Sequence, residues 1–398
     1  MTVTNKRPKA IRRSSVVVIG GGYAGALAAN RLQQNPDLDI TIINSRSLFV
    51  ERVRLHQMVA GSGKATVALA EILGERVRLI VDTATRIDVA NRTVALESGG
   101  SVSYDYLIYA VGSTGTVPAG MHGAREFAYP ISELEQAERL RAALIELPED
   151  APICVVGGGL TGIEAASELA EQRPKARVTL LCGGTLAPSV SEKGRASVRR
   201  QLVRLGVEID DAAMVAELRG DHVRLADGRV VPSAATVWTA GFGVPDLAAR
   251  SGLSTDELGR LLTDETLTSI DDERIIGAGD ATAPAGQPLR MSCQAAMPLA
   301  ARAVNTVLDR VAGNQPTPLG QSFVGQNISI GRRYGTIRLA HSDDTPRSFY
   351  VGGKMAATIK EYVCTMVVKQ IAKESRKPGS YSWPGAKKLP VASTSAAR

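Results

Sequence analysis

The chain carries one pattern twice, as Val16-Val17-Val18-Ile19-Gly20-Gly21-Gly22-Tyr23-Ala24-Gly25 and again as Ile153-Cys154-Val155-Val156-Gly157-Gly158-Gly159-Leu160-Thr161-Gly162. Each copy is an apolar run typical of a buried strand, followed by G-x-G-x-x-G and an alanine-rich stretch typical of a helix. This arrangement places a dinucleotide pyrophosphate at a helix N-terminus, where backbone N–H groups and the helix dipole favour an anion. Because a whole domain fits between the copies, the sequence predicts two dinucleotide-binding units.

Both copies depart from the pattern where the ribose should bind. Such units carry an acidic residue roughly 20 positions after the last glycine, which binds the ribose hydroxyls. Here the first expected strand, 40–43, is followed by Asn44, whose amide can still hydrogen-bond a ribose. The second, 178–181, is followed by Cys182 and two glycines. Without a carboxylate to repel a 2′-phosphate or an arginine to select it, we expect NADH or NADPH with no preference.

Length and composition narrow the class of protein. At 398 residues with 44% hydrophobic residues, the chain can bury two cores and a third small segment. No apolar run reaches the roughly 18 to 20 residues of a spanning helix. The basic stretch 6–13 imitates a signal peptide, but cleavage after Ala28 or Ala29 would destroy the first glycine fingerprint. The four cysteines form no close pair, which argues against a redox dithiol, a zinc or other metal site and a disulfide scaffold, and fits a reducing cytoplasm.

The net charge of +7 is concentrated at the two ends. Residues 1–15 contain five basic residues and no acid, and 351–398 contain nine basic residues against Glu361 and Glu374, so the body between them is acidic. Basic ends suggest attraction to anionic lipid or nucleic acid, with solvated tails as the plain alternative. Because aromatic residues are not interleaved with the basic ones, we expect no specific nucleic-acid recognition.

Further patterns outline the remaining elements. Alternation in 77–80, 84–89 and 93–97 predicts short antiparallel strands. The stretches 104–110 and 236–241 both read as strands that end in small residues, so the repeat extends to a closing strand in each unit. A strand at 274–277 ends in a glycine turn with Asp280 at its tip, which is either functional or a helix cap. The last part predicts β-like stretches, a helix over 354–373 and a mobile tail after Pro378.

Together these motifs resemble the FAD-dependent pyridine-nucleotide oxidoreductases over about residues 14–330. The resemblance implies an α/β fold with two Rossmann-like dinucleotide-binding domains, in which an NAD(P)H domain is inserted into a split FAD domain, plus a small C-terminal α+β segment. The corresponding boundaries are 14–125 for the first part of the FAD domain, 126–245 for the NAD(P)H domain, 246–326 for the second part of the FAD domain and 327–398 for the C-terminal segment.

The resemblance also assigns cofactor-binding residues. For FAD it implies Gly20, Gly22, Tyr23, Ala24, Gly25, Asn44, Arg52, Val81, Ala110, Gly112 and Asp280. For NADH or NADPH it implies Gly157, Gly159, Leu160, Thr161, Gly162, Glu164, Cys182 and Gly241. Arg52 and Arg54 could neutralise a reduced flavin or an FAD phosphate, although pairing with Glu51 is an equal alternative for one of them.

Two features favour one branch of the family. The disulfide reductases place redox cysteines on the helix that corresponds to 49–61, and this chain has none there. It is more similar to the type II NADH:quinone oxidoreductases and the apoptosis-inducing-factor-like quinone reductases. Their second fingerprint matches Thr161-Gly162-Ile163-Glu164, and their Ala-Gln-x-Ala motif corresponds to Ser292-Cys293-Gln294-Ala295-Ala296, where Cys293 replaces the first alanine.

Three residues are candidates for the chemistry that accompanies hydride transfer from nicotinamide to flavin. Quinone reduction consumes protons, and Glu164 is expected to supply or relay them, unless it is only a carboxylate stabilised by its helix N-terminus. Gln294 and His56 are expected near the acceptor, with a purely structural His56 as the alternative.

The C-terminal helix has an apolar stripe of Met355, Ile359, Tyr362, Val363, Met366, Val367 and Gln370/Ile371, with lysines at 354, 360, 369 and 373 around it. The stripe fits an interfacial membrane helix on anionic lipid and fits equally well packing against the FAD domain or a second copy in a homodimer. We therefore expect a cytoplasmic protein, with peripheral attachment to the inner face of the membrane as the more specific hypothesis.

The leading prediction is a flavin-dependent NAD(P)H dehydrogenase that passes electrons to a quinone-like acceptor without a redox disulfide. A second hypothesis is a reductase or oxidase for an iron–sulfur protein, oxygen or a biosynthetic intermediate. A third is an apoptosis-inducing-factor-like protein whose flavin reduction switches the binding of a partner.

Overall fold

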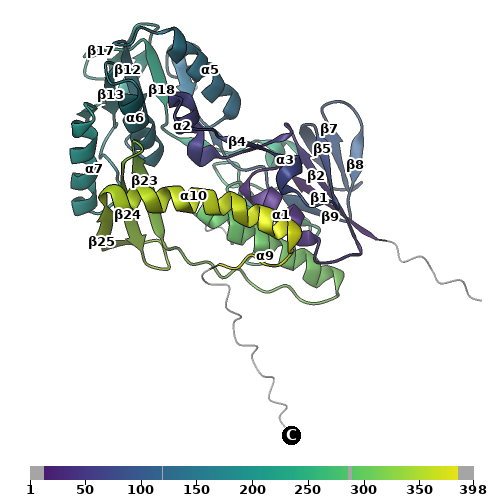
Figure 1. Ribbon diagram of the computed structural model, residues 1–398. Helices are drawn as coiled ribbons and strands as arrows, with labels where there is room; N and C mark the ends of the chain where they lie inside the picture. The colour runs from purple at the N-terminus through teal and green to yellow at the C-terminus, as the bar shows by residue number, and fades with distance from the viewer. Residues whose placement is uncertain (1–12, 119, 286–288, 384–398) are drawn as a thin grey trace, which may run out of the picture.

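The computed structural model describes residues 13–118, 120–285 and 289–383, and two parallel β-sheets form its framework (Figure 1). The first sheet has the strand order β21-β9-β1-β2-β5. Its strands are β1 (Ser14–Ile19), β2 (Leu38–Asn44), β5 (Val77–Val81), β9 (Tyr106–Tyr109) and β21 (Ile275–Gly277), and each neighbouring pair is parallel. The apolar run of β1 is buried because both faces of the sheet are covered.

Different layers cover the two faces of this sheet. Val16 and Val18 belong to a core with helices α1 (Tyr23–Leu32) and α9 (Cys293–Val311). Val17 and Ile19 face a second core, to which the antiparallel sheet of β6 (Ala84–Asp88), β7 (Thr93–Leu96) and β8 (Ser101–Ser103) contributes. The alternating side chains of one strand therefore hold both layers to the sheet.

One predicted pairing is wrong. The alternation in 77–80 predicted an antiparallel strand, but β5 pairs in parallel with β2, from Ile40 beside Val77 to Asn44 beside Val81. β5 lies at the edge of the sheet, where it is only partly covered, and its one polar residue, Arg78, is exposed between the half-buried Val77 and Leu79. Periodicity reports this burial and not the direction of the neighbouring strand.

The second sheet repeats this architecture with the order β11-β18-β12-β13-β14. Its parallel strands are β11 (Ala128–Pro130), β12 (Pro152–Val156), β13 (Arg177–Leu181), β14 (Glu208–Asp210) and β18 (Ala235–Trp238). Helices α5 (Leu134–Glu146), α6 (Leu160–Gln172) and α7 (Glu192–Arg204) share one core with it. The antiparallel strands β15 (Val215–Leu218), β16 (His222–Leu225) and β17 (Val230–Pro232) share the core on its other face.

The second sheet is inserted into the first. Strands β9 and β21 are paired neighbours, although all strands of the second sheet lie between them in the sequence. The two connecting segments meet in an antiparallel pair of β10 (Thr114–Gly115) and β19 (Phe242–Gly243). Two Rossmann-like units, one inserted into the other, are therefore confirmed as the fold class.

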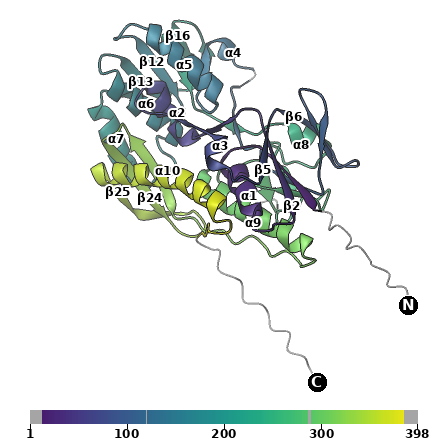
Figure 2. The same ribbon diagram turned by 45° about the vertical axis from the view of Figure 1, so that its right-hand side comes forward.

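The C-terminal segment forms the antiparallel strands β23 (Gly325–Ile330), β24 (Tyr334–Ala340) and β25 (Pro346–Gly352), followed by the helix α10 (Gly353–Arg376). Figures 1 and 2 show α10 running beneath the lobe of the second sheet and on toward the first sheet, where it packs on α1. None of the helices that the structure describes is long and apolar enough to cross a membrane.

The prediction of a mobile tail after Pro378 is wrong for residues 379–383, which make specific contacts with the rest of the protein. The carboxylate of Glu374 is fully buried and accepts hydrogen bonds from the backbone N–H groups of Gly379 and Tyr381. It also pairs with Arg31 at 3.0 Å, and Trp383 donates its indole N–H to the carbonyl of Gly320. These contacts fix the segment up to Trp383, and the rest of the predicted tail, 384–398, lies outside the described residues.

Short elements complete the structure: β3 (Leu48–Val50), η1 (Arg52–Arg54), α2 (Leu55–Ala60), β4 (Thr66–Ala68), α3 (Leu69–Ile72), α4 (Ala124–Phe127), α8 (Leu247–Arg250), β20 (Leu261–Thr263) and β22 (Thr282–Pro284).

Candidate active site

The two glycine loops have the same geometry. Gly20 and Gly157 have φ of +102° and +123°, in the region that favours glycine. A Cβ on Gly25 would lie 1.7 Å from the carbonyl oxygen of Gly20, so only glycine permits this close packing of helix against strand. The corresponding distance from Gly162 to the carbonyl oxygen of Gly157 is 1.9 Å. In both units the glycines therefore allow the helix to pack closely against the preceding strand and turn.

The space in front of each helix fits a dinucleotide pyrophosphate. Gly22 and Gly159 are the N-cap residues of α1 and α6, and no side chain caps either helix. A Cβ at Gly22 or Gly159 would meet no atom within 4 Å, so each loop leaves room for an approaching group. Uncapped N–H groups, the positive end of the helix dipole and open space together form an anion site.

Asp280 joins several parts of the first Rossmann-like unit. Its Oδ2 accepts a 2.7 Å hydrogen bond from the Ser113 hydroxyl, and its Oδ1 accepts the backbone N–H of Ser292 at 3.1 Å. The helix cap of α9 is Ser292 itself, whose hydroxyl accepts from the N–H of Ala295. Asp280 therefore links the end of β21 to α9 and to the segment after β9, and does not cap a helix through its own side chain.

Arg52 is fully engaged by the protein. It donates to the carbonyl oxygens of Ser113 at 2.7 Å and Ser132 at 3.0 Å, and lies 4.0 Å from the Glu133 carboxylate. Arg52 thereby connects the segment after β9, which contains Ser113, to the loop after β11, which contains Ser132. The alternative of pairing with Glu51 is realised by Arg54 instead, at 3.0 Å.

Other expected FAD residues lie around the first loop. Asn44 uses its amide on the loop: Oδ1 accepts the N–H of Gly21 at 2.8 Å, and Nδ2 donates to the carbonyl of Arg46. Tyr23 packs edge-on against Phe49, and its hydroxyl has no hydrogen-bond partner within the described residues. Burial raises the pKa of Tyr23 well above its usual value. The hydroxyl of Tyr23 is therefore neutral and buried.

The remaining expected FAD positions can offer backbone or apolar contacts only. Ala110 is buried and donates its N–H to the carbonyl of Ile19, while Gly112 has φ of +72° and open space around it. Val81 lies at the end of β5 and is 53% exposed. Ala24 is buried in the helix.

The NAD(P)H half contains a carboxylate that the sequence did not reveal. Cys182 packs on the glycine loop, because a Cβ on Gly158 would lie 2.8 Å from the Cys182 Cβ. Burial and the nearby Asp211 raise the pKa of this thiol to about 12, so it is neutral. Asp211 follows β14, accepts the N–H of Leu186 and pairs with Arg199. Asp211 therefore places a carboxylate beside the Cys182 loop from the neighbouring strand, which only the sheet order could show.

The other residues of the second loop keep their expected positions. Leu160 and Thr161 begin α6 directly after the Gly159 cap. Gly241 has φ of +88°, and a Cβ there would lie 2.8 Å from the Thr116 hydroxyl oxygen. Gly241 thus allows the two connections between the units to approach closely.

A buried ion pair lies where α6, α2, β23 and α10 meet. The Lys360 ammonium is 2.9 Å from Oε1 of Glu164 and also donates to the carbonyl of Asn327 at 3.2 Å. The same Glu164 oxygen accepts the N–H of Ser329 at 3.0 Å and its hydroxyl at 3.1 Å. His56 lies 4.0 Å from the other carboxylate oxygen, Oε2. The structure therefore brings Glu164 and His56 together.

These neighbours fix the charges of the cluster. Burial alone would raise the pKa of Glu164, but Lys360, His56 and the Ser329 N–H lower it overall. Burial lowers the pKa of His56 to about 4, despite the attraction of Glu164. The pKa of Lys360 is raised overall, because Glu164 outweighs the effect of burial. Near neutral pH the cluster is an ionised Glu164–Lys360 pair beside a neutral imidazole.

The apolar stripe predicted on α10 is divided in the structure: its first part is exposed, and Ile371 near its end is buried. Of the predicted apolar stripe, Met355 and Tyr362 are 61% and 64% exposed, whereas Ala356 and Cys364 are buried. Lys360, which was expected among the surrounding charges, points inward with this buried face and pairs with Glu164. A lysine enters the interior here because a carboxylate 196 positions earlier in the chain compensates it, and a single sequence gives no signal of that partner.

Gln294 makes its hydrogen bonds with residues outside the Glu164 cluster. It is in the first turn of α9, accepts a hydrogen bond from Arg290 at 3.3 Å and contacts Gln321 through its carbonyl oxygen. Beside it, burial raises the pKa of the Cys293 thiol, so this residue is a neutral apolar neighbour.

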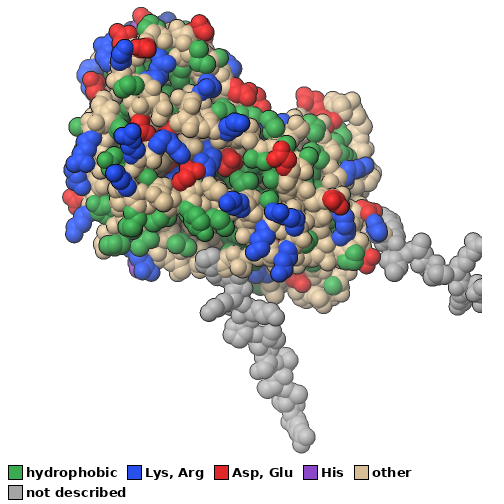
Figure 3. All heavy atoms as spheres, viewed as in Figure 1, with side chains coloured by type: hydrophobic (Ala, Val, Ile, Leu, Met, Phe, Trp, Pro, Cys, Tyr) green, Lys and Arg blue, Asp and Glu red, His purple; other side chains and the backbone are tan. Residues whose placement is uncertain are grey.

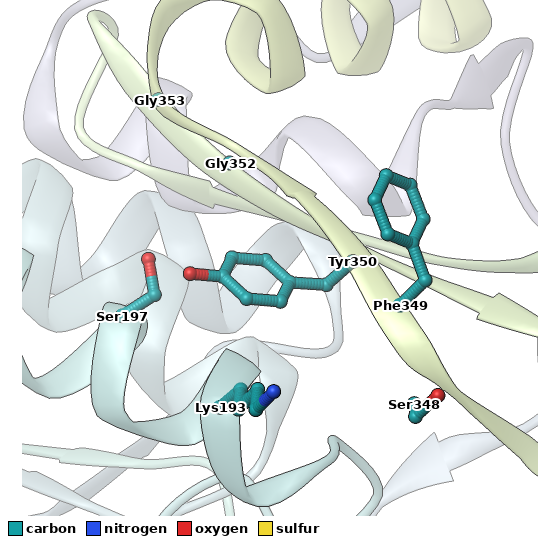
Figure 4. A pocket seen from close by; sticks show the side chains of 7 residues that line it. All are labelled: Lys193, Ser197, Ser348, Phe349, Tyr350, Gly352 and Gly353. Carbon is teal, nitrogen blue, oxygen red and sulfur yellow. The ribbon is translucent and has the colours of Figure 1, made fainter.

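The cysteines and a second hollow were the other candidates for a functional site. All four cysteines are free, and among the described residues no group of His, Cys, Asp or Glu is arranged to hold a metal ion. A hollow of about 530 Å³ lies between α7 and β25, where the Tyr350 hydroxyl points toward Ser197 above Lys193 (Figure 4). No residue of either glycine fingerprint lines it.

Comparison with known proteins places the chain in a class. The family model described as pyridine nucleotide-disulphide oxidoreductase matches residues 14–305. The chain belongs to this family, and the resemblance inferred from its motifs is confirmed. It is therefore an oxidoreductase.

Within this family the chain is similar to type II NADH dehydrogenases. It is 30% identical over 315 residues to an NADH dehydrogenase-like protein of Mycobacterium tuberculosis, which covers 71% of this chain and 77% of the relative. It is also 30% identical over 349 residues to the type II NADH:quinone oxidoreductase Ndh of the same organism, covering 77% and 74%.

Solved structures share the fold at low sequence identity. The sulfide:quinone oxidoreductase of Aquifex aeolicus matches with a TM-score of 0.77 and 21% identity, covering 91% of this chain and 92% of that one. NDH2 of Plasmodium falciparum, solved with NADH, also has a TM-score of 0.77, with 14% identity and coverage of 94% and 100%.

Proposed function

We propose that the chain is a flavin-dependent NADH dehydrogenase that passes electrons to a quinone or a similar organic acceptor. The observation that carries this proposal is the pair of matched, uncapped glycine cradles, with the buried Glu164–Lys360 pair between the elements that flank them. The relatives named as NADH dehydrogenases and as a type II NADH:quinone oxidoreductase support it.

In this proposal FAD binds at the α1 cradle, with Asp280 beside its ribityl chain, and NADH binds at the α6 cradle. NADPH remains a second donor to be tested. When bound, the flavin accepts hydride from the nicotinamide and passes electrons on. The protein residues hold the cofactors, exclude water and manage protons. No cysteine in 49–61 offers a redox disulfide, so the acceptor takes its electrons directly.

Glu164 and Lys360 are the groups proposed to manage protons at the acceptor. Lys360 keeps its proton because of Glu164, and its positive charge stabilises an anion that develops nearby. Glu164 is ionised and can accept a proton that arrives from solvent. His56 is neutral and orients the pair, and Gln294 and Tyr23 offer polar atoms on the side of α9 and α1.

Two measurements test the proposal. The cofactor released by heating the purified protein should migrate with FAD and not FMN on chromatography. The protein should then oxidise NADH with a menaquinone or ubiquinone analogue faster than with oxygen or a small iron–sulfur protein. Preference for one of the latter acceptors would replace the quinone hypothesis by the second sequence-based hypothesis.

We also propose that α10 attaches the protein to the cytoplasmic face of a membrane. Met355, Ile359, Tyr362 and Val363 are exposed on its first half, next to Phe349, which is 65% exposed. Figure 3 shows these elements covered by hydrophobic side chains, with Lys and Arg gathered toward the other end of α10. An apolar stripe with basic residues beside it suits a surface of anionic lipid.

Vesicle co-sedimentation with the full chain tests this attachment. Replacing Ile359 and Tyr362 together by serine should abolish binding to vesicles that contain phosphatidylglycerol, whereas Ile145→Ser, at an exposed site on α5, should not. If the double variant binds as the parent does, the attachment is refuted. Loss of a dimer in the same variant, by analytical ultracentrifugation, would instead assign the stripe to a second copy.

A further inference from the structure

A hollow of about 490 Å³ opens beside the Glu164 cluster, between α2, the loop that follows it and α10. Its wall includes Ser62, Arg332, Arg54 and Glu361. Glu361 accepts hydrogen bonds from Arg54 at 2.7 Å and from Arg332 at 2.9 Å. The hydrogen bond from Arg54 is the main cause that lowers the pKa of Glu361 to about 2, and the bond from Arg332 adds to it. The Glu361 carboxylate in this wall is therefore ionised near neutral pH.

Glu168 is a buried carboxyl group that the proposed function has not used. Its side chain is 0% exposed and lies on α6, one helical turn after Glu164. One oxygen, Oε1, accepts the Ser62 hydroxyl and lies 4.0 Å from Nε of Arg332. The other, Oε2, has no hydrogen-bond partner within the described residues. Because an unpaired buried oxygen is costly, this atom calls for a water or a proton.

Ser62 connects Glu168 to the hollow. The same side chain lines the hollow and donates to the Glu168 carboxyl group. A hydroxyl can donate one hydrogen bond while it accepts another. Ser62 can therefore accept from water in the hollow while it donates to Glu168.

The surroundings of Glu168 favour its protonated form. Burial raises the pKa of Glu168, and the negative charges of Glu171 and Glu164 add to this, against the opposing effects of Ser62 and Arg332. Its neighbour Glu164 has a lowered pKa. Two carboxyl groups whose environments separate their pKa values in this way are suited to act as acid and base.

Other charged groups nearby keep their state. On α10, Lys360 stays protonated and Glu361 stays ionised, and on α2, His56 stays neutral. Arg332, in the turn between β23 and β24, is the cation next to Glu168. The pKa shifts of Lys360, Glu361 and His56 keep these three groups in one protonation state near neutral pH. Burial also raises the pKa of Glu51 in the wall of the hollow, but this carboxylate is paired with Arg54 at 3.0 Å.

We propose that Glu168 and Ser62 form an inlet through which protons pass from the hollow to Glu164. This inference rests on the proposed function, in which NADH supplies a hydride and the reduced quinone takes one further proton from solvent. The carboxylic acid of Glu168 gives its proton to the Glu164 carboxylate through a water bound at its unpartnered Oε2. The Ser62 hydroxyl then transfers its proton to Glu168 and regains one from a hydronium ion or a buffer acid that enters the hollow.

Substitutions of both inlet residues test the proposal in the purified, flavin-loaded protein. Glu168→Gln keeps the shape but holds no transferable acid, and Ser62→Ala removes the hydroxyl. Both should slow the reoxidation of reduced flavin by a quinone analogue at least tenfold at pH 8 and increase its solvent deuterium isotope effect, while reduction by NADH stays unchanged. Ser62→Thr, which keeps a hydroxyl, should restore the rate.

Glu146→Gln is the matched control, because Glu146 is an exposed carboxyl group at the end of α5 and has no part in the proposed inlet. It should reoxidise as the parent does. Reoxidation at the parental rate and pH dependence in Glu168→Gln would overturn the inlet, and so would a Ser62→Thr variant as slow as Ser62→Ala.

An infrared measurement without substrate separates this inference from the proposed function. The parent and Glu146→Gln should keep the carbonyl stretch of a protonated carboxylic acid to a higher pH than an ordinary carboxyl group does, and Glu168→Gln should lack that band. Absence of a difference between the parent and Glu168→Gln would refute the proton-holding role. A parent that shows the band but is not reoxidised by quinone would instead refute the proposed acceptor.

Discussion

Removing the Lys360 ammonium should destabilise the protein strongly, because it leaves the Glu164 carboxylate buried without its counter-charge. The two charged atoms are 2.9 Å apart, and the side chains are 12% and 9% exposed. An exposed pair would contribute only about 0–1 kcal/mol, whereas removing one partner of a buried pair costs about 3–5 kcal/mol. Since Ser329 still donates two hydrogen bonds to the carboxylate, we expect Lys360→Met to lower the free energy of unfolding by about 3 kcal/mol at pH 7.

A variant with both Glu164 and Lys360 replaced separates the interaction between the two charges from the contribution of each residue alone. Replacing a buried ion pair by uncharged residues of similar volume is often nearly neutral. We therefore expect Glu164→Gln combined with Lys360→Met to be more stable than Lys360→Met alone, with a coupling energy of about 2 kcal/mol in the double-mutant cycle.

The pH dependence should change sign in Lys360→Met. In the parent the pKa of Glu164 is lowered, so its contribution to stability is present above the ordinary carboxyl pKa and is lost as the pH falls through the lowered value. Without Lys360, burial raises the pKa of this carboxyl group. The variant should then gain stability from Glu164 as the pH falls through the raised value, so the difference from the parent should shrink below about pH 5.

Guanidinium unfolding of the flavin-loaded protein measures these effects. Trp238 in the second sheet and Trp383 after α10 report on separate parts of the chain. Coincident fluorescence and circular dichroism transitions would show that one unfolding free energy is meaningful. A Lys360→Met variant within about 1 kcal/mol of the parent at pH 7, a loss typical of an exposed pair, would refute the reasoning.

Three further predictions follow from the second nucleotide unit. Gly162→Ala should lower the free energy of unfolding by about 3 kcal/mol, because its Cβ would lie 1.9 Å from the carbonyl oxygen of Gly157. Gly159→Ala should leave stability within about 0.5 kcal/mol but raise the KM for NADH, since its methyl group enters the cradle; a normal KM would contradict the assignment of that cradle. Asp211→Asn should raise kcat/KM for NADPH relative to NADH about tenfold, equivalent to about 1.4 kcal/mol, because a carboxylate beside the Cys182 loop repels a 2′-phosphate; an unchanged ratio would remove Asp211 from donor selection.

Much of the fold follows from the sequence because the glycine loops constrain it tightly. Gly20 has a positive φ and Gly25 packs closely against it, and together these features require a strand, a tight turn and a helix in that order. Gly157 and Gly162 require the same order in the second copy. The direction of β5 did not follow, since alternation is shared by parallel edge strands and antiparallel strands. The ordered segment up to Trp383 did not follow either, because Glu374 fixes it through contacts with Arg31 and backbone groups distant in sequence.

The candidate site divides in the same way. Glu164 could be predicted because it lies at a fixed position after the second fingerprint. Lys360 and Glu168 could not be predicted, because the role of each side chain depends on a partner from another element. The partner of Lys360 is Glu164, and that of Glu168 is Ser62. The apolar periodicity of α10 was also ambiguous, since two overlapping stripes exist and the one with Cys364 is buried. The roles of the cofactor-binding residues and the domain boundaries stay predictions.

The most direct test of the central claim is anaerobic stopped-flow mixing of the purified protein with NADH, followed by a quinone analogue. The account predicts rapid bleaching of the flavin absorbance and then rapid reoxidation that depends on quinone concentration. Slow bleaching by both NADH and NADPH, or bleached flavin that quinone does not reoxidise, would contradict it.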